Sequence, residues 1–171
     1  SFRDSFRSRI FKLLISSKNK YLFERNKYQN CHQVEKYNHY INDCLKTDFK
    51  AGKLNIKPSL NSSFNYSDPV VGINPGSSYG EAKRWYPEEY AEVCAKLSLQ
   101  YNIVIFGGPG EEDIAIDIEK SLIEKGILNY QNLSGKTSIS ELVDHISNLD
   151  LFITGDSGPM HLAASFQVPT V

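Results

Sequence analysis

The sequence predicts an α/β domain, a parallel sheet with flanking helices, preceded by a smaller part. Apolar runs typical of buried strands recur along the second half of the chain, at residues 70–74, 102–106, 132–133, 151–154 and 169–171. Amphipathic stretches of helical length alternate with these runs, at residues 87–101, 111–124 and 138–149. This alternation is typical of a parallel sheet, in which ligands bind at the carboxyl ends of the strands. The Gly-rich loops of the sequence follow strands, so we expect them at that edge.

The helix boundaries have local causes. Pro87 suits the first turn of a helix over residues 87–101, because its ring presets φ and that position needs no N–H partner. Ser138 is an expected N-cap for residues 138–149, with Glu141 as its capping-box partner.

The first part of the chain is basic. Over residues 3–27, Lys and Arg far outnumber acids and alternate with aromatic and aliphatic side chains. This pattern fits a segment that touches an anionic membrane surface or a phosphorylated acceptor, or a solvated helix face whose apolar stripe lies in a core. Residues 32–45 have helical spacing, with Val34, Tyr37 and Ile41 among the residues on one face.

Residues 47–68 are rich in Asn, Ser, Lys and Pro and predict a linker. We therefore expect two parts, residues 1–68 and residues 69–171, with the linker at the end of the first.

Composition excludes several classes of protein. Of the 171 residues, 40% are hydrophobic and 23% are charged, which is typical of a globular domain, and a net charge of −1 gives no reason to expect nucleic acid as a partner. Three cysteines fit neither a disulfide framework nor a zinc site and suit a reducing cytoplasm. The sequence has neither an initiator Met nor a signal-peptide pattern, and it finishes on an apolar run, so we expect it to be a piece of a longer protein.

The most informative stretch is GDSGPMHLAA at residues 155–164, between a strand and a helix. Its glycines allow unusual backbone conformations, and the N-terminus of the following helix can bind an anion. His161 lies one turn into that helix, where it can face the same ligand. The alternative is that Asp156 or Ser157 is only an N-cap, worth about 1 kcal/mol.

Two further loops could take part in binding. The first is NPGSSYGEAKRWYP at residues 74–87, in which Ser77 and Ser78 could donate hydrogen bonds to phosphate oxygens and Lys83 could neutralise the phosphate charge. The alternative is that the two serines are turn formers and Lys83 is a surface charge. In the loop at residues 107–112, Glu111 could accept from a ribose hydroxyl or could only complement the helix dipole.

Other chemistries lack their motifs in the sequence. There is no GxGxxG or P-loop pattern, no metal-ligand spacing, and no nucleophile elbow around Ser157. We therefore expect no cofactor and no metal ion.

The stretches NPGSSYGEAKRW (74–85) and GDSGPMHLAA (155–164) together resemble the ADP-heptose:lipopolysaccharide heptosyltransferases, glycosyltransferase family 9. The GEAKRW form is most similar to the heptosyltransferase II branch, and HQVEKY (32–37) resembles the segment that closes the family's first domain. The resemblance implies a GT-B fold, in which two Rossmann-like domains have the active site between them. Residues 1–68 would then be the C-terminal part of the acceptor-binding domain with its linker, and residues 69–171 an incomplete nucleotide-sugar-binding domain.

Family roles are carried over from the matching motifs. The resemblance implies that Ser77, Ser78 and Lys83 hold the donor's phosphates and that Glu111 binds the ribose. It further implies that Asp156 contacts the heptose, and that the pyrophosphate and sugar are surrounded by Ser157, Gly158 and His161.

The implied reaction is metal-free, inverting transfer of heptose from ADP-heptose to the lipopolysaccharide inner core, with Lys83 stabilising the leaving diphosphate. The family's base is an Asp after its first strand, which this chain lacks, so the chain alone is expected to be inactive. The expected location is the cytoplasm, with peripheral contact at the inner membrane. A transferase using another sugar nucleotide and a non-catalytic nucleotide-binding module are the alternatives.

Overall fold

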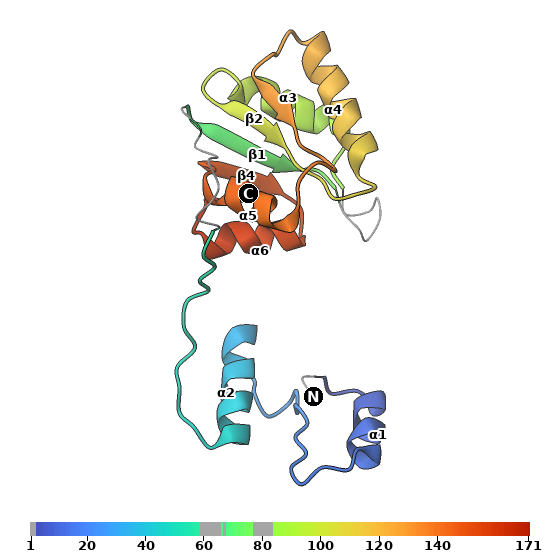
Figure 1. Cartoon of the computed structure of the whole chain (residues 1–171), viewed down its shortest axis with the longest axis vertical. Coiled ribbons are helices and arrows are strands. Elements are labelled where there is room, and N and C mark those ends of the chain that lie inside the picture. The colour runs from blue at the N-terminus through green and yellow to red at the C-terminus, as the bar shows by residue number, and fades with distance from the viewer. Residues whose placement is uncertain (1–2, 59–65, 67, 77–83) are drawn as a thin grey trace. The chain divides into compact units, whose positions relative to one another are not determined.

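The computed structural model describes residues 3–58, 66, 68–76 and 84–171, which form parts of two compact units (Figure 1). The N-terminal unit comprises Ser1–Lys53 and the C-terminal unit Leu54–Val171. The division falls inside the stretch predicted as a linker. Tyr66, near the end of that stretch, packs against the core of the C-terminal unit.

The N-terminal unit contains two helices, α1 (Phe6–Leu14) and α2 (Gln33–Leu45). The predicted helix at residues 32–45 is confirmed, with His32 as its N-cap in a capping box. Its buried face differs from the spacing-based expectation, because Tyr40 is buried while Val34 and Ile41 are exposed. The small core consists of Phe23, Tyr28 and Tyr40, whose rings are in stacked and edge-to-face contact.

The basic segment does not bury the apolar stripe that a core-facing helix would have. No residue of α1, which lies wholly within the described part of the chain, is buried. Phe6, Leu13 and Leu14 are among its most exposed side chains. From this segment, Phe23 enters the core instead, although it lies outside the helix.

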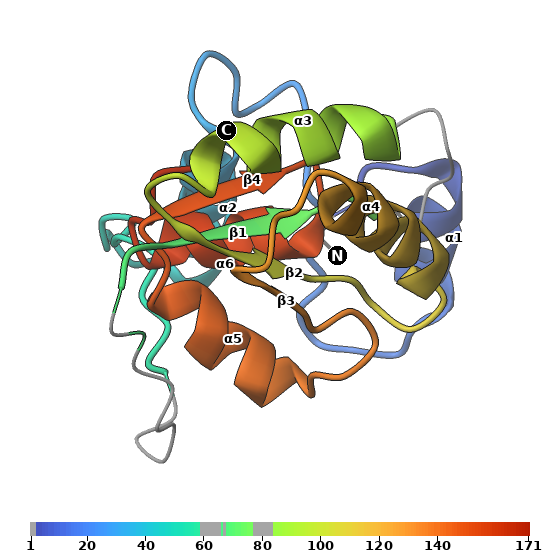
Figure 2. The ribbon, with the colours of Figure 1, turned by 90° about the horizontal axis from the view of Figure 1, so that it is seen from above.

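The C-terminal unit is built on four parallel strands: β1 (Val70–Asn74), β2 (Asn102–Ile105), β3 (Tyr130–Asn132) and β4 (Leu151–Thr154). Their order in the sheet is β3-β2-β1-β4 (Figure 2). Beyond β4, Thr170 forms a further parallel bridge to Phe152, as the apolar run at residues 169–171 predicts. The predicted α/β class with a parallel sheet is confirmed.

Two pairs of helices cover the two faces of this sheet. The helices are α3 (Pro87–Leu97), α4 (Glu112–Glu124), α5 (Ile139–Ser147) and α6 (Gly158–Ser165). α3 and α4 pack together on one face, and α5 and α6 on the other (Figure 1). The chain moves outward from β1 to β3 and then returns to β4 on the other side of β1. The loops after β1 and β4 therefore leave in opposite directions, and such a switch point is where α/β sheets bind ligands.

Close packing of the central strand requires a glycine. A Cβ at Gly72 would lie 2.5 Å from Leu149 Cδ1 and 2.9 Å from ring carbons of Phe106 and Phe152. These side chains belong to the core between the sheet and α5 and α6. The missing side chain at Gly72 lets the two aromatic rings lie directly on β1.

Some element bounds differ from the sequence-based ones. α3 ends at Leu97 rather than at residue 101, with the Ser98 hydroxyl donating to the carbonyl of Ala95. β3 covers Tyr130–Asn132 rather than residues 132–133, because ladder pairing to β2 decides where the strand lies. Within the part of the chain that the structure describes, no helix has the length and apolar character to cross a membrane.

Candidate functional site

A cleft of about 790 Å³ lies in the C-terminal unit, at the carboxyl ends of the strands. Each of the four strands contributes lining residues through the loop that follows it. The described lining consists of Asn74 at the end of β1, Gly76 and Arg84 after β1, Gly107–Glu111 after β2, Thr137, Ser138, Ile139 and Leu142 after β3, and Asp156–Pro159 and His161 after β4. The loops nominated from sequence thus meet in one place.

The structure brings together five of the eight predicted site residues. Glu111, Asp156, Ser157, Gly158 and His161 all line the cleft. The other three, Ser77, Ser78 and Lys83, lie outside the described residues. Gly76 and Arg84, which flank that stretch, line the cleft themselves.

The N-terminus of α6 opens into the cleft without a side-chain cap. Ser157 occupies the N-cap position with an extended backbone, but its hydroxyl makes no capping bond. It shares a 3.1 Å hydrogen bond with Thr154 Oγ1 instead. The reading of Ser157 as only a capping residue is therefore not borne out. The first N–H groups of α6 and the positive end of its dipole are arranged to receive an anion.

The N-terminus of α5 contrasts with that of α6. Ser138 Oγ accepts from the backbone N–H of Glu141, and the Glu141 carboxylate accepts from the backbone N–H of Ser138 at 2.8 Å. That backbone hydrogen bond lowers the pKa of Glu141. The predicted capping box is confirmed, and it satisfies donors of α5 that a ligand would otherwise use.

Glu111 is held at the junction of two loops. Its carboxylate Oε2 accepts a 2.8 Å hydrogen bond from the backbone N–H of Gly108. A Cβ at Gly76 would lie 2.2 to 2.4 Å from the carboxyl carbon and both oxygens of Glu111. The carboxylate therefore fills the space left by the missing side chain of Gly76. Although Glu111 is the N-cap of α4, it makes no side-chain capping bond.

The turn before α4 also depends on local chemistry. Gly110 has φ +87°, a conformation that L side chains rarely adopt, and its N–H donates to Glu112 Oε2 at 2.7 Å. The tight turn presents the backbone of Gly107, Gly108 and Gly110 to the cleft. A ligand can therefore approach the main chain closely here.

Sequence reasoning missed four lining residues that the fold supplies. These are Thr137, Ser138, Ile139 and Leu142, which follow β3. Asn74, only 4% exposed, ends β1 and begins a stretch that the sequence analysis had already nominated. Thr137, Ile139 and Leu142 could be placed only once the strand order was known, because a helix after β3 reaches the cleft only if β3 is in the same sheet.

Among the residues that the structure describes, no three His, Cys, Asp or Glu side chains are grouped to hold a metal ion. The fold is shared by TibC from enterotoxigenic Escherichia coli, a dodecameric glycosyltransferase described as iron-containing. Its solved structure matches with a TM-score of 0.52 and 21% identity, over 81% of this chain and 35% of TibC.

Known proteins similar to the chain include heptosyltransferases. Lipooligosaccharide heptosyltransferase 2 of Campylobacter jejuni (strain NCTC 11168) is 40% identical over 176 residues, covering the whole of this chain and 55% of the relative. The chain thus spans about half the length of the curated relative. The structure of E. coli ADP-heptose LPS heptosyltransferase II matches with a TM-score of 0.59 and 32% identity, over 63% of this chain and 33% of that one.

The fold extends further in another solved structure. A family 9 glycosyltransferase of Veillonella parvula matches with a TM-score of 0.70 over 94% of this chain and 47% of that one, at 24% identity. These structural neighbours are GT-B enzymes. The model of glycosyltransferase family 9 (heptosyltransferase) matches residues 13–171, and the chain therefore belongs to that family.

Proposed function

We propose that the protein is a heptosyltransferase II-like enzyme that transfers L-glycero-D-manno-heptose from ADP-heptose to the inner core of lipopolysaccharide or lipooligosaccharide. One observation supports the part of this proposal that concerns ADP-heptose. The same cleft is lined by the Glu111 carboxylate, a hydrogen-bond acceptor held in place by the Gly108 N–H, and by the N-terminus of α6, which has no side-chain cap. A ribose diol needs a hydrogen-bond acceptor, and a diphosphate needs N–H donors and positive potential. The family and the relatives' names support the choice of sugar and acceptor.

Each site residue has a proposed role. Glu111 accepts a hydrogen bond from a ribose hydroxyl. Ser77, Ser78 and Lys83 hold the phosphates from the loop after β1. Asp156 contacts the heptose, and Ser157, Gly158 and His161 surround the pyrophosphate and sugar.

The proposed chemistry is inverting transfer without a metal ion. A base removes the proton from an acceptor hydroxyl, that oxygen attacks the anomeric carbon, and ADP leaves from the opposite face. Lys83 and the dipole of α6 stabilise the charge on the departing diphosphate. No residue of this chain is assigned as the base. If no metal takes part, activity of the full-length enzyme will survive EDTA.

The proposed place of action is the cytoplasm, with peripheral contact at the inner membrane, because a lipid-linked acceptor lies at a membrane surface. Sedimentation of the full-length enzyme with vesicles containing its acceptor, compared with vesicles lacking it, measures that contact.

Donor binding tests the central claim. Isothermal titration calorimetry of the chain with ADP and with ADP-heptose will show saturable binding. Glu111→Gln will raise the Kd of both ligands about tenfold or more, because a hydrogen bond to a charged acceptor contributes roughly 1.5–3 kcal/mol. Asp113→Asn, which removes an exposed carboxylate from the same helix outside the cleft lining, is the matched control.

Binding of neither ligand would favour a non-catalytic role. Tighter binding of another sugar nucleotide, such as a UDP- or GDP-sugar, would refute the choice of donor while leaving the nucleotide site intact.

A further inference from the structure

Asn74 is buried at the edge of the sheet where the cleft opens. It ends β1, one of the two inner strands, and is 4% exposed. Successive side chains of a strand point to opposite faces, and a Cβ at Gly72 would meet Phe106 and Phe152 in the core between the sheet and α5 and α6. Asn74, two residues further on, therefore points to the same face of the sheet as Gly72.

The neighbouring strand brings the start of α6 next to Asn74. In the parallel ladder Asn74 is paired with Thr154 of β4, so the two side chains lie side by side on one face. Thr154 Oγ1 shares a 3.1 Å hydrogen bond with Ser157 Oγ, and Ser157 is the N-cap residue of α6. The side-chain amide of Asn74 therefore lies on the side of the cleft that the N-terminus of α6 occupies.

The side-chain amide of Asn74 is a buried polar group without a partner in the part of the chain that the structure describes. No described residue donates a hydrogen bond to it or accepts one from it. Burying an amide unbonded is costly, and buried side-chain amides in native proteins are therefore nearly always hydrogen-bonded. Since Asn74 lines the cleft, a molecule that enters the cleft can supply the partner.

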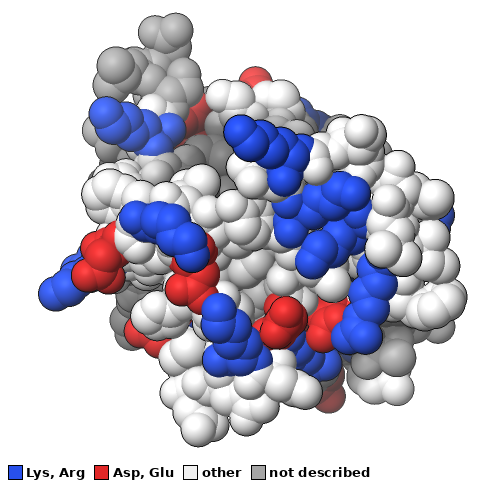
Figure 3. All heavy atoms as spheres, turned by 90° about the horizontal axis from the view of Figure 1, so that it is seen from below, with Lys and Arg blue, Asp and Glu red and all other residues white. Residues whose placement is uncertain are grey.

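The charge of the C-terminal unit makes such a local donor important for an anion. Residues 54–171 contain 7 Lys and Arg against 15 Asp and Glu, whereas residues 1–53 contain 12 against 5. On the face drawn in Figure 3, Lys and Arg side chains lie together with Asp and Glu. In the described lining of the cleft, Arg84 is accompanied by two carboxylates, Glu111 and Asp156. An excess of acids repels an anion at long range, so a diphosphate in the cleft depends on donors in direct contact with it.

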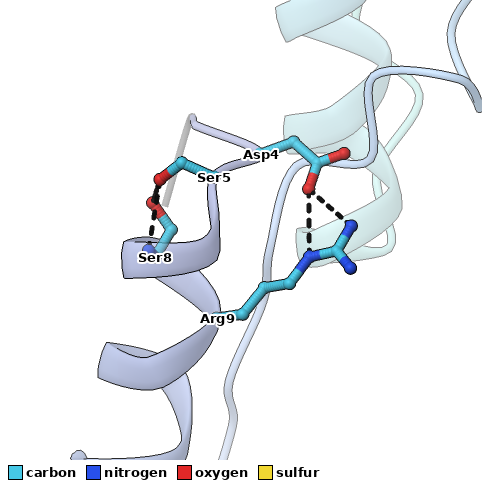
Figure 4. A network of polar contacts seen from close by, with 4 residues as sticks. All are labelled: Asp4, Ser5, Ser8 and Arg9. Atoms are coloured by element: carbon cyan, nitrogen blue, oxygen red, sulfur yellow. Dashed lines mark hydrogen bonds and ion pairs between the residues drawn. The ribbon is translucent and has the colours of Figure 1, made fainter.

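A comparison with α1 shows that the start of α6 also offers donors. In α1, Ser5 Oγ accepts from the backbone N–H of Ser8 at 3.2 Å (Figure 4). Ser157 holds the same N-cap position in α6, but it makes no side-chain capping bond. The first N–H groups of α6 and the side-chain N–H groups of Asn74 thus lie on one side of the cleft, and both kinds of group donate to anionic oxygens.

We infer that the Asn74 side chain donates a hydrogen bond from Nδ2 to an oxygen of the diphosphate of ADP-heptose. Nδ2 rather than Oδ1 turns to this ligand, because ionised phosphate oxygens only accept hydrogen bonds. The proposed ribose contact, Glu111, belongs to the loop after β2, whereas Asn74 lies beside β4 and the N-terminus of α6. The identity of the ligand rests on the proposed function, and the contact makes Asn74 a residue that selects a nucleoside diphosphate over a nucleoside.

Asn74→Leu tests the contact, because Leu has a similar branched shape and no hydrogen-bonding group. In titrations of the ¹⁵N-labelled chain, the Kd for ADP will rise about fivefold or more, whereas the Kd for adenosine will change less than about twofold. The urea midpoint will not fall, since the side-chain amide has no partner to lose among the described residues. Equal weakening of ADP and adenosine, whatever the midpoint, would show that Asn74 shapes the cleft rather than contacts the diphosphate, and would overturn the inference.

The side-chain N–H pair of Asn74 gives a direct readout. Its resonances are identified as the pair that is missing from the spectrum of Asn74→Leu. We expect them to shift saturably with ADP, at the same Kd as the backbone amides of residues 107–111 and 155–161, and to shift far less with adenosine. A pair that stays in place while those backbone amides shift would contradict the contact.

Two variants with the same change in charge separate the contact from general repulsion. Asn74→Asp replaces the N–H donor by a carboxylate of the same shape and will raise the Kd for ADP about twentyfold or more. Asn55→Asp, at an exposed position of the same unit outside the cleft lining, will change it less than about twofold. Equal effects of the two substitutions would show general charge repulsion and overturn the inference.

The same titrations show whether the proposed function itself fails. Retained ADP affinity in Asn74→Leu, together with a loss in Glu111→Gln, would overturn the Asn74 contact alone and leave the nucleotide site in place. Absence of ADP binding by the wild-type chain would overturn both.

Discussion

Substitution of Gly76 by Ala tests how the structure positions Glu111. The new Cβ would lie 2.2 to 2.4 Å from the carboxyl carbon and oxygens of Glu111, a distance no real contact adopts, so the carboxylate must move. Moving it breaks the 2.8 Å bond from the Gly108 N–H. A charge-assisted hydrogen bond contributes roughly 1.5–3 kcal/mol, so loss of the proposed ribose contact would raise the Kd for ADP roughly 10- to 150-fold.

The unfolding free energy should fall by a smaller amount, about 1 kcal/mol, because Glu111 is half-buried and its displaced carboxylate can find water. Calorimetry with ADP and urea unfolding measure the two effects. Gly52→Ala is the control, since Gly52 lies outside the cleft lining and its Cβ would meet no atom within 4 Å.

A double-mutant cycle shows whether the effect of Gly76→Ala passes through Glu111. In a Glu111→Ala background, Gly76→Ala should have little further effect on ADP binding. An undiminished effect there, or wild-type affinity in Gly76→Ala alone, would refute the positioning of Glu111 by Gly76.

Two further predictions concern stability. Gly72→Ala should lower the unfolding free energy by about 1–3 kcal/mol in urea titrations, because its Cβ would overlap Leu149, Phe106 and Phe152 in a closed core. The control Gly52→Ala, whose Cβ would meet no atom within 4 Å, should change the unfolding free energy by no more than about 0.5 kcal/mol. Equal unfolding free energies in the two variants would show that the core can relax. His145 is 4% exposed, and its Nδ1 lies 2.6 Å from the Tyr66 hydroxyl. Burial lowers the pKa of His145, so the folded state resists protonation of this side chain. The unfolding free energy should therefore fall as the pH drops through 6.5, the pKa of His145 in the unfolded chain. The charges of Glu141 and Asp144 act to raise the pKa of His145, but burial is the larger effect. Urea midpoints measured at pH 7.5 and pH 5.5 should therefore differ less in His145→Gln than in the wild-type chain. An unchanged difference between the two midpoints would assign the pH dependence to other groups.

Much of the C-terminal unit could be predicted because its signals are local. The alternation of apolar runs and amphipathic stretches indicates a parallel sheet, and the Ser138–Glu141 capping box depends only on a spacing of three residues. The same locality limited the N-terminal unit. Its core forms from Phe23, Tyr28 and Tyr40, and no helical period joins these three residues along the chain.

The candidate site could be predicted only in part for the same reason. Glu111 and the stretch around Ser157 were identifiable as loops of suitable chemistry, but for Glu111 the alternative of complementing the helix dipole stayed open, and for Ser157 that of simple capping. The structure bears on the second alternative, because Ser157 makes no side-chain capping bond whereas Ser138 at α5 forms a complete capping box. Such bonds depend on side-chain rotamers and on neighbouring loops, which sequence spacing does not specify.

The sequence by itself determined the fold class, the family resemblance and the loops that supply the site, because each follows from residue types at short spacing. Only the tertiary structure decided which loops meet. The strand order β3-β2-β1-β4 brings the ends of all four strands to one cleft and sets the carboxylate of Glu111 against Gly76, 35 positions away in the chain. Contacts between distant segments arise from packing and strand pairing in three dimensions, so no local pattern could predict them.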